Sequence, residues 1–472
     1  MRSLKLERIL LAFALGLACR TPPEHDEPIG QEPIPEPPIP PAAVEPAPTI
    51  DGSFDDWSEI AAIAADAQDD AVGSFDVTRI QATARGSELF VRLDTSTILN
   101  LYSGPSEDGT LVLGVRVEDG RELRVDLRAR HVELSGGSAL PWSALHFVAS
   151  PNHASNDFEM RLDLSALDVA EGQRIAVWLE GSDTVSQAEI VAGAPPPAAP
   201  ELDVSSSDSA VRVASLNTHL EGLADPYRAP KIRRLLRAAE ADVYSLQELG
   251  TMPDDAIADA LNSAHVDGSD APWNVYGVSY GQYVKSAVAS RHPLVPIHTT
   301  LARFAGAIVL FDGGPVAVFS VHFKCCGYYG SPEDETRLWE ADLLRRTIQS
   351  LREGNLGTAY DEYAAAPVVV MGDFNDVGSP QLQTLFTAYP LELSRGAPLH
   401  LAGRDSFTWR DDSGFPPAIL DLTLYDGLAM SRAFVLDSAL LDADALEELD
   451  LSTSDSEGSD HLLVVADFDR AD

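Results

Sequence analysis

The stretch that decides the fold is Val368-Val369-Val370-Met371-Gly372-Asp373-Phe374-Asn375. Its apolar residues predict a buried strand, and this strand ends at a carboxylate and a carboxamide. Side chains at positions i and i+2 of an extended segment point in the same direction, so Asp373 and Asn375 can reach one ligand. Such groups are costly inside a core unless they find partners. We therefore expect the strand to lead into a functional site.

Other predicted strands end in polar residues in the same way. They lie in residues 215–219, 246–249, 320–324 and 419–423, and residues 458–461 are a similar polar stretch that leads into a strand. Their polar residues are Asn217, Glu248, His322, Asp421, Asp460 and His461. One such ending is a weak signal, because many strands simply end at the surface. Six endings in one region favour a shared site over unrelated surface loops.

Strands and helices alternate over residues 208–472. Apolar runs predict strands at residues 211–216, 243–246, 316–322 and 462–467. Between the first two, apolar residues from Ile232 to Ala239 recur at i, i+3, i+4 and i+7, the spacing of one helix face. This alternation predicts an α/β domain.

Length and charge limit the class of protein. A chain of 472 residues is too long for one ordinary core, so two or more domains are expected. The net charge of −41 repels polyanions at a distance and disfavours binding of nucleic acid through a basic stripe. A bound divalent cation can still reverse the field locally. No apolar run beyond residue 20 is long enough to span a bilayer.

The first residues are typical of an export signal. Basic residues precede the apolar residues 9–18, a run that is too short for a transmembrane helix. The end, Leu15-Gly16-Leu17-Ala18-Cys19, resembles a bacterial lipoprotein signal, which implies residues 1–19 as signal peptide, lipidation of Cys19 and anchoring to a membrane. Cleavage as an ordinary secretory signal stays open. The proline-rich residues 20–48 predict an extended linker. We expect an exported protein, either lipid-anchored or secreted.

Residues 49–192 have the pattern of an all-β module. Short period-two stretches recur, and Asp119-Gly120 between two of them is a hairpin signal. Many short strands of this kind predict a β-sandwich. The opening Ile50-Asp51-Gly52-Ser53-Phe54-Asp55-Asp56-Trp57 resembles β-sandwich modules of the DOMON and carbohydrate-binding type, which implies a glycan as ligand. We expect Trp57 in the core rather than on a sugar-binding surface.

This half has an acidic group whose role stays open, and a second linker follows it. The acidic residues Asp66, Asp69, Asp70 and Asp76 form either a structural Ca²⁺ site, because hard oxygen ligands suit that ion, or a solvated loop. A second linker, rich in proline and serine, follows at residues 193–207 and separates the module from the α/β region.

The order of polar strand endings resembles the endonuclease/exonuclease/phosphatase superfamily, which includes deoxyribonuclease I. The resemblance covers residues 208–470, and Gly372-Asp373-Phe374-Asn375 and Ser459-Asp460-His461 are its most specific parts. It implies a four-layer α/β sandwich for residues 208–472, with two β-sheets packed face to face and helices outside. The site is then expected at the sheet edges, where the polar loops gather.

The resemblance also implies a metal site. Glu248 is implied as the principal ligand of Mg²⁺ or Mn²⁺, with Asn217 and Asp460 nearby. Carboxylate and amide oxygens are ligands that these hard cations prefer, together with water and substrate oxygens. Such a cation assists the hydrolysis of phosphate esters, so a phosphate ester is the expected substrate class.

The remaining residues are implied to do the chemistry. Asp373 positions or deprotonates the attacking water, and Asn375 holds that water or a phosphoryl oxygen. His461, oriented by Asp421, acts as general acid/base or as a cation facing the transition state. His322 is a second electrophile on the phosphate. Whether Asp373 or a histidine takes the proton stays open.

Two functions remain to be compared. The first is an exported, divalent-metal-dependent phosphoesterase that hydrolyses phosphodiester bonds of nucleic acid, a phospholipid headgroup or a small diester. The second is an anchored binding protein that is catalytically weak or inactive and adheres through its β-sandwich. Inactive members of such families usually lose metal or histidine residues, and every one is matched here. The sequence therefore favours the enzyme.

Two adjacent cysteines, Cys325 and Cys326, lie close to His322 in sequence. Neighbouring Cα atoms are closer than an ordinary disulfide prefers. Either a strained bridge between neighbours or two free thiols near the site accounts for them.

Overall fold

The computed structural model describes most of the chain from Ala47 onward. The described residues are 47–65, 76–101, 109–196, 204, 211–265, 272–281, 284–299, 302–396, 398–400, 405–410 and 417–470. They belong to one compact unit, Glu45–Asp472. The predicted signal with Cys19, most of the first linker, and Asp66, Asp69 and Asp70 lie outside these residues. No helix in the described part is long and apolar enough to cross a membrane.

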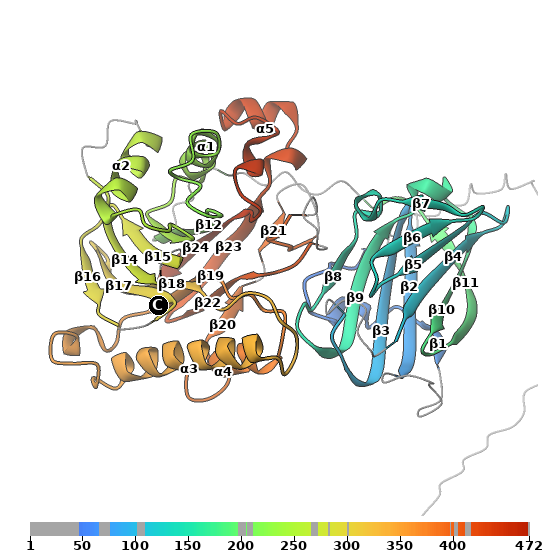
Figure 1. Ribbon diagram of the computed structural model, residues 1–472, viewed down its shortest axis with the longest axis horizontal. Helices are drawn as coiled ribbons and strands as arrows, with labels where there is room; N and C mark the ends of the chain where they lie inside the picture. The colour runs from blue at the N-terminus through green and yellow to red at the C-terminus, as the bar shows by residue number, and fades with distance from the viewer. Residues whose placement is uncertain are drawn as a thin grey trace, which may run out of the picture. The chain divides into compact units, whose positions relative to one another are not determined.

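The first half of the described chain is all-β, as predicted. Its strands form one sheet of eleven, here called the N-terminal sheet, in the order β7-β6-β5-β4-β10-β11-β2-β3-β9-β8 with β1 beside β2 (Figure 1). The strands are β1 (Ala62–Ala65), β2 (Val77–Arg85), β3 (Glu88–Leu99), β4 (Leu111–Val117), β5 (Glu122–Asp126), β6 (His131–Leu134), β7 (Ser138–Leu140), β8 (Val148–Ser150), β9 (Ser155–Asp163), β10 (Arg174–Gly181) and β11 (Val185–Gly193). The predicted hairpin at Asp119-Gly120 is confirmed, because β4 and β5 pair antiparallel across it.

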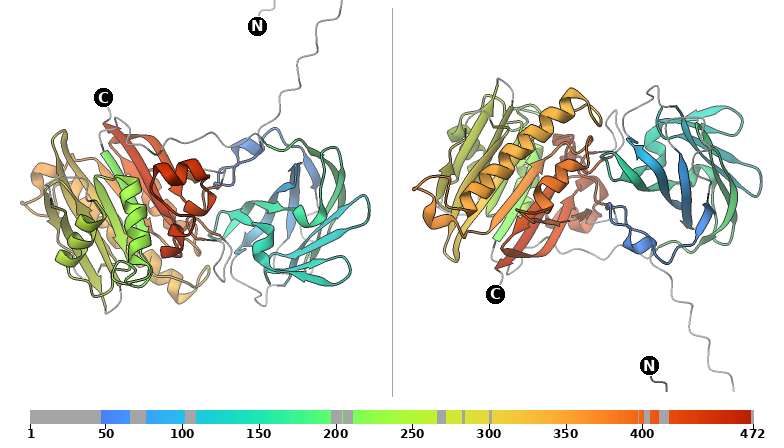
Figure 2. Two further views of the ribbon diagram at one scale, coloured as in Figure 1. Left: turned by 90° about the horizontal axis from the view of Figure 1, so that it is seen from above. Right: turned by 90° about the horizontal axis from the view of Figure 1, so that it is seen from below.

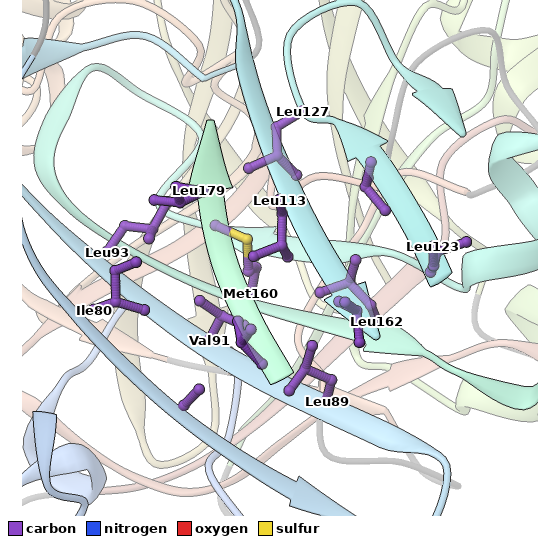
Figure 3. Close-up of a cluster of buried hydrophobic side chains, with 14 of the residues drawn as sticks. Ile80, Leu89, Val91, Leu93, Leu113, Leu123, Leu127, Met160, Leu162 and Leu179 are labelled. Carbon is purple, nitrogen blue, oxygen red and sulfur yellow. The ribbon is translucent and has the colours of Figure 1, made fainter. Parts of the chain in front are cut away.

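The N-terminal sheet encloses a core of its own. Figure 3 shows leucine, isoleucine, valine and methionine side chains from β2, β3, β4, β9 and β10 meeting in one cluster. Trp57 is fully buried, as predicted, and its indole N–H donates to Glu159 Oε2 at 2.8 Å. Asp76, the one described residue of the acidic group, accepts a hydrogen bond from Ser96 Oγ at 2.7 Å.

The second half contains two further sheets. One has seven strands in the order β14-β15-β13-β12-β24-β23-β21, and the other has six in the order β16-β17-β18-β19-β22-β20. The seven are β12 (Val211–Asn217), β13 (Val243–Gln247), β14 (Asn274–Tyr280), β15 (Val284–Ser290), β21 (Leu399–His400), β23 (Leu428–Leu436) and β24 (Leu463–Arg470). The six are β16 (Leu294–Ile297), β17 (Phe304–Phe311), β18 (Gly314–His322), β19 (Val368–Asp373), β20 (Ser394–Gly396) and β22 (Asp421–Asp426).

The predicted four-layer arrangement is confirmed for this half. Val213 of one sheet and Val318 and Met371 of the other share the core between the sheets. The outer face of the seven-stranded sheet packs on α1 (Ala229–Ala239) and α2 (Asp254–Ala264). The outer face of the six-stranded sheet packs on α3 (Pro332–Arg352) and α4 (Gln381–Thr387). Figure 2 shows α1 and α2 from one side and α3 from the opposite side. A short helix, α5 (Ala443–Glu448), lies between β23 and β24.

The start of α3 follows from its sequence. Ser331 accepts a hydrogen bond from the Asp334 backbone N–H, Pro332 occupies the first turn, and acidic residues follow it. A serine cap, an early proline and negative charge at the amino end all favour this boundary. The cap matters for the site, because Asp334 Oδ1 accepts the backbone N–H of Ser379 at 2.9 Å, just beyond the Asp373 loop.

Candidate active site

Strand pairing brings the predicted polar residues to one edge of the two sheets. In the six-stranded sheet, Asp373 lies between His322 and Asp421, its partners on β18 and β22. In the seven-stranded sheet, Asn217 at the end of β12 pairs with the last residue of β13, directly before Glu248. Asn217, His322 and Asp373 are thus the last residues of their strands, whereas Asp421 is the first residue of β22 and not the end of a strand as expected.

Asp373 lies at the centre of the group. Its Oδ2 accepts a hydrogen bond from Asn217 Nδ2 at 3.1 Å, and the same amide donates to Glu248 Oε1 at 3.2 Å. His322 Nε2 is 3.6 Å from both Asp373 Oδ2 and Glu248 Oε1. This amide and this imidazole therefore link carboxylates that come from different sheets.

His461 approaches the same oxygen of Asp373. Its Nε2 is 3.6 Å from Asp373 Oδ2, and its Nδ1 lies 2.7 Å from Asp421 Oδ2. All three side chains are almost completely buried. Because Asp421 holds Nδ1, the orientation of the His461 ring is fixed and Nε2 lies towards Asp373.

Burial and neighbouring charges shift the pKa values in this group. Burial opposes the charge on His461, but the carboxylates of Asp421 and Asp373 outweigh it and raise its pKa to about 10. Burial raises the pKa of Asp373 to about 7, against the attraction of His461. Burial lowers the pKa of His322 to about 4, so this ring is neutral at pH 7. The two histidines thus differ in charge.

Two of the predicted site residues have left-handed backbone conformations. Glu248 has a φ of 53°, and its Oε2 accepts the backbone N–H of Leu220 at 2.7 Å. Asn375 has a φ of 49°. Strained residues of this kind concentrate at functional sites.

The geometry of Asn375 differs from the extended segment expected from the sequence. β19 ends at Asp373, and the chain turns so that the backbone N–H of Asn375 donates to Asp373 Oδ1 at 2.9 Å. The side-chain amide of Asn375 donates to the Phe323 carbonyl at 3.1 Å. Asn375 therefore braces the loop and the Asp373 carboxylate, and its side chain does not run parallel to that of Asp373.

Asp460 lies on the more open side of the group. Its Oδ1 is 3.5 Å from Nδ1 of His219, and its side chain is 29% exposed. Neighbouring Ser459 donates from Oγ to the Asn217 carbonyl at 2.6 Å, which ties this loop to the end of β12. All eight predicted site residues thus come from loops and strand ends of the same sheet edge.

Comparison with protein families agrees with this geometry. Residues 214–461, just over half of the chain, match the Endonuclease/Exonuclease/phosphatase family. The chain belongs to this family. Members of the endonuclease/exonuclease/phosphatase family act as nucleases or phosphatases on phosphoester bonds. No curated protein matches the chain.

Several solved structures of low identity are similar to the family region. A 3′ phosphatase, NExo from Neisseria bound to product DNA hairpin, is 21% identical, with 55% of this chain and 100% of that chain covered and a TM-score of 0.38. The human Nocturnin catalytic domain with bound sulfate is 18% identical, with 55% and 94% covered and a TM-score of 0.38. Beta toxin 275-280 from Staphylococcus aureus is 15% identical, with 54% and 99% covered and a TM-score of 0.36. Likeness at this level says nothing about the substrate of this chain.

The donor set suits the divalent cation that the family generally uses. Within the described residues, no three His, Cys, Asp or Glu side chains are arranged to enclose a metal by themselves. Mg²⁺ needs no such cage, because it is usually held by one or two carboxylates, waters and substrate oxygens. Glu248 and Asp460 offer carboxylate oxygens at this sheet edge, which fits such a sparse site. Asn217 turns its Nδ2 towards Glu248 and Asp373, and its Oδ1 accepts the backbone N–H of His219 at 3.0 Å.

Two further residues that contact the site, Thr408 and Trp409, were not predicted from the sequence. The Trp409 ring lies 5.1 Å from the His461 ring, centroid to centroid. Thr408 Oγ1 accepts the backbone N–H groups of Leu420, at 3.0 Å, and Asp421, at 2.9 Å. Their only local signal is a tryptophan beside a threonine outside any regular strand, which is too weak to predict a role.

A buried polar network lies between the two sheets next to the site. Gln247 Nε2 donates to Ser245 Oγ at 2.8 Å and to Ser320 Oγ at 3.0 Å. Ser245 belongs to β13 and Ser320 to β18, so the network connects the two sheets directly under Glu248 and Asp373. Ser245 Oγ also donates to the Met371 carbonyl at 2.9 Å.

The two adjacent cysteines are free thiols in the structure. Their Sγ atoms are 2.9 Å apart, and Lys324 Nζ donates to the Cys325 carbonyl at 3.2 Å. The structure therefore has two free thiols here and not a bridge between neighbouring cysteines.

Proposed function

We propose that this protein is a divalent-metal-dependent phosphodiesterase. The observation that carries the proposal is the geometry around Asp373: its buried Oδ2 lies 3.6 Å from Nε2 of both His322 and His461, and Asp421 holds Nδ1 of His461. A core has no need of this arrangement, whereas hydrolysis needs a base, an acid and positive charge at one point.

Each side chain receives a role from its protonation state. His461 is protonated at neutral pH and cannot accept another proton, so we assign the base to Asp373, which positions and deprotonates the attacking water. His461 stabilises the charge that develops on the phosphoryl oxygens and donates a proton from Nε2 to the leaving oxygen. Neutral His322 donates a hydrogen bond to the phosphate. Asn375 keeps the Asp373 carboxylate in place through the loop.

A bound Mg²⁺ or Mn²⁺ would neutralise charge on the phosphoryl oxygens and the leaving group. Glu248 would be its principal ligand, with Asn217 and Asp460 alongside. The leading substrates remain a nucleic acid, a phospholipid headgroup or a small phosphodiester. The net charge of −41 favours the last two, because a strongly negative surface repels long polyanions.

The experiment that tests this function is hydrolysis of bis(p-nitrophenyl) phosphate by the full chain. We expect turnover with Mg²⁺ or Mn²⁺ and loss of turnover with EDTA or in His461→Ala. The matched control is His131→Ala, which removes an exposed histidine from β6. The proposal fails if His461→Ala and Asp373→Ala both keep turnover. It also fails if the folded wild-type protein hydrolyses neither this diester nor a panel of phosphate monoesters.

We further infer that the protein acts outside the cytoplasm, attached through Cys19. The apolar signal and the proline-rich linker support this placement. The N-terminal sheet would then be a β-sandwich of the DOMON or carbohydrate-binding type that holds the enzyme near a glycan. Mass spectrometry of the mature N-terminus tests the anchor, because a diacylglyceryl group on Cys19 is expected and an unmodified N-terminus contradicts it.

A further inference from the structure

A segment of the N-terminal sheet contacts the loops that carry the active site. This segment, residues 152–154, connects β8 to β9. Asn152 Nδ2 donates to the Ile419 carbonyl at 2.6 Å, and the backbone N–H of Ala154 donates to the Gly378 carbonyl at 2.8 Å. Between them, His153 Nδ1 lies 3.0 Å from Asp376 Oδ2. Three consecutive residues thus hold two separate loops.

These two loops carry the groups that would do the chemistry. Asp376 directly follows Asn375, and Ile419 lies two residues before Asp421. The loops are joined to each other, because the backbone N–H of Phe374 donates to the Leu420 carbonyl at 2.9 Å. A shift of either loop would therefore move the Asp373 carboxylate or the partner of His461.

The groups that make these contacts lie largely away from solvent. Asp376 is 2% exposed and Asn152 is 3% exposed. Burial raises the pKa of Asp376, but the charge and hydrogen bond of His153, with a hydrogen bond from Gln383 and the charge of Arg395, outweigh it, so that the pKa lies below its usual value. A buried carboxylate fixed by several partners holds its loop in one position more firmly than an exposed pair.

A third loop is held in the same way. Arg161 of β9 donates from Nε to Asp405 Oδ1 at 3.2 Å. Phe407 belongs to the same cluster of buried side chains as Ile50 and Trp57. The next two residues are Thr408 and Trp409, which contact the Asp421 backbone and the His461 ring. The N-terminal half therefore also contacts the stretch that leads to Thr408 and Trp409.

We propose that Asn152 and His153 are positioning residues of the active site. Neither is placed to touch substrate, and both act by fixing the loops of Asp373 and Asp421. The inference rests on the proposed phosphodiesterase function for its effect on turnover. It assigns the N-terminal sheet a part in catalysis in addition to any ligand that it binds.

The test compares full-length variants of His153. His153→Ala removes the donor to Asp376, whereas His153→Asn places an amide N–H close to the position of Nδ1. With bis(p-nitrophenyl) phosphate we expect a roughly tenfold lower kcat for the alanine variant and a nearly unchanged KM, because the loss is one of alignment. The asparagine variant is expected to recover most of the loss. Arg124→Ala, which breaks a half-buried ion pair with Glu180 in the same sheet, is the control and keeps wild-type kcat.

Amide hydrogen exchange supplies a readout that does not depend on activity. His153→Ala and Asn152→Ala are expected to speed exchange in residues 374–378 and 419–421 but not in α1. Wild-type exchange in these loops together with an unchanged kcat would overturn the inference. So would an asparagine variant as impaired as the alanine variant. If wild-type protein hydrolyses no phosphate ester, the proposed function falls, and exchange alone decides whether these residues fix the loops.

Discussion

Replacing Asp421 by Asn tests the charge arrangement on which the mechanism depends. Asp421 is 1% exposed, and its Oδ2 lies 2.7 Å from His461 Nδ1. Asparagine has the same shape and can still accept a hydrogen bond from Nδ1, so the fold is expected to survive. What disappears is the negative charge that keeps His461 protonated.

The size of the effect follows from the pKa of His461. Burial opposes the charged ring, but the neighbouring carboxylates raise the pKa of His461 from the ordinary histidine value of 6.5 to about 10, which corresponds to roughly 5 kcal/mol in favour of the charged ring. Asp421 is the largest of the groups that raise it, and burial continues to oppose the charge in the variant. We therefore expect the pKa of His461 to fall well below 10 in the variant, and the rate to fall by about 10²–10⁴-fold if His461 acts as acid.

The same shift predicts how stability depends on pH. Because the folded-state pKa of His461 lies above its unfolded value, its contribution is fully present below pH 6.5 and is lost as the pH rises through about 10. Wild-type protein should thus lose more unfolding free energy between pH 6.5 and 10 than Asp421→Asn. Urea unfolding at the two ends of this window measures the difference.

Histidine NMR provides the direct assay. The His461 ring signal, assigned by its absence in His461→Gln, is titrated in wild-type protein and in Asp421→Asn, alongside kcat for the diester at each pH. Two results would refute the reasoning. One is a His461 ring that still titrates near pH 10 in the variant, and the other is a kcat within threefold of wild type.

Four further expectations concern other parts of the molecule. Asp467→Asn removes the carboxylate that pairs with buried Arg212 at 2.7 Å and should lower the unfolding free energy by about 3–5 kcal/mol in urea titrations. Gln247→Leu removes the hydrogen-bond donor between the two sheets and should lower the unfolding free energy by about 1–3 kcal/mol in the same titrations. An unchanged unfolding free energy would show that Gln247 does not hold the sheets together. Burial and the neighbouring Cys325 raise the pKa of Cys326 to about 11, so its alkylation by iodoacetamide should be slow at pH 7.5 and about tenfold faster for each pH unit above it, as peptide mass spectrometry can follow. If the protein cleaves DNA, moderate salt should speed cleavage at low substrate, because it screens the repulsion of a chain of net charge −41; a steep loss with salt would contradict this.

The fold of the second half was predictable because its signals are local. Apolar runs that end in a carboxylate, an amide or a histidine recur at β12, β18 and β19, and each run is one strand in the structure. The residues at those ends converge because neighbouring strands end at one edge. The family resemblance then supplied the four layers, which no periodicity of the sequence specifies.

The contacts of the N-terminal sheet with the site were not predictable in this way. His153 and Asp376 are 223 positions apart, and Asn152 and Ile419 are 267 apart. Nothing in the sequence around Asn152 distinguishes it from other residues between strands. Packing between distant segments decides such contacts. The direction of Asn375 was missed for a related reason, since the turn that follows β19 replaces the extended geometry on which the i, i+2 rule depends.

The site combines groups from both sheets, so its geometry depends on how one sheet lies over the other. Asn217 and Glu248 come from the seven-stranded sheet, whereas Asp373 comes from the six-stranded sheet, and a hydrogen bond of 3.1 Å crosses between them. Apolar packing alone tolerates small sliding of two sheets, because it has no preferred direction. The buried hydrogen bonds of Gln247 do not, because each needs a donor and an acceptor in register. A polar network under the site, which costs stability compared with an apolar core, is therefore the expected means of keeping Asp373 within reach of Asn217.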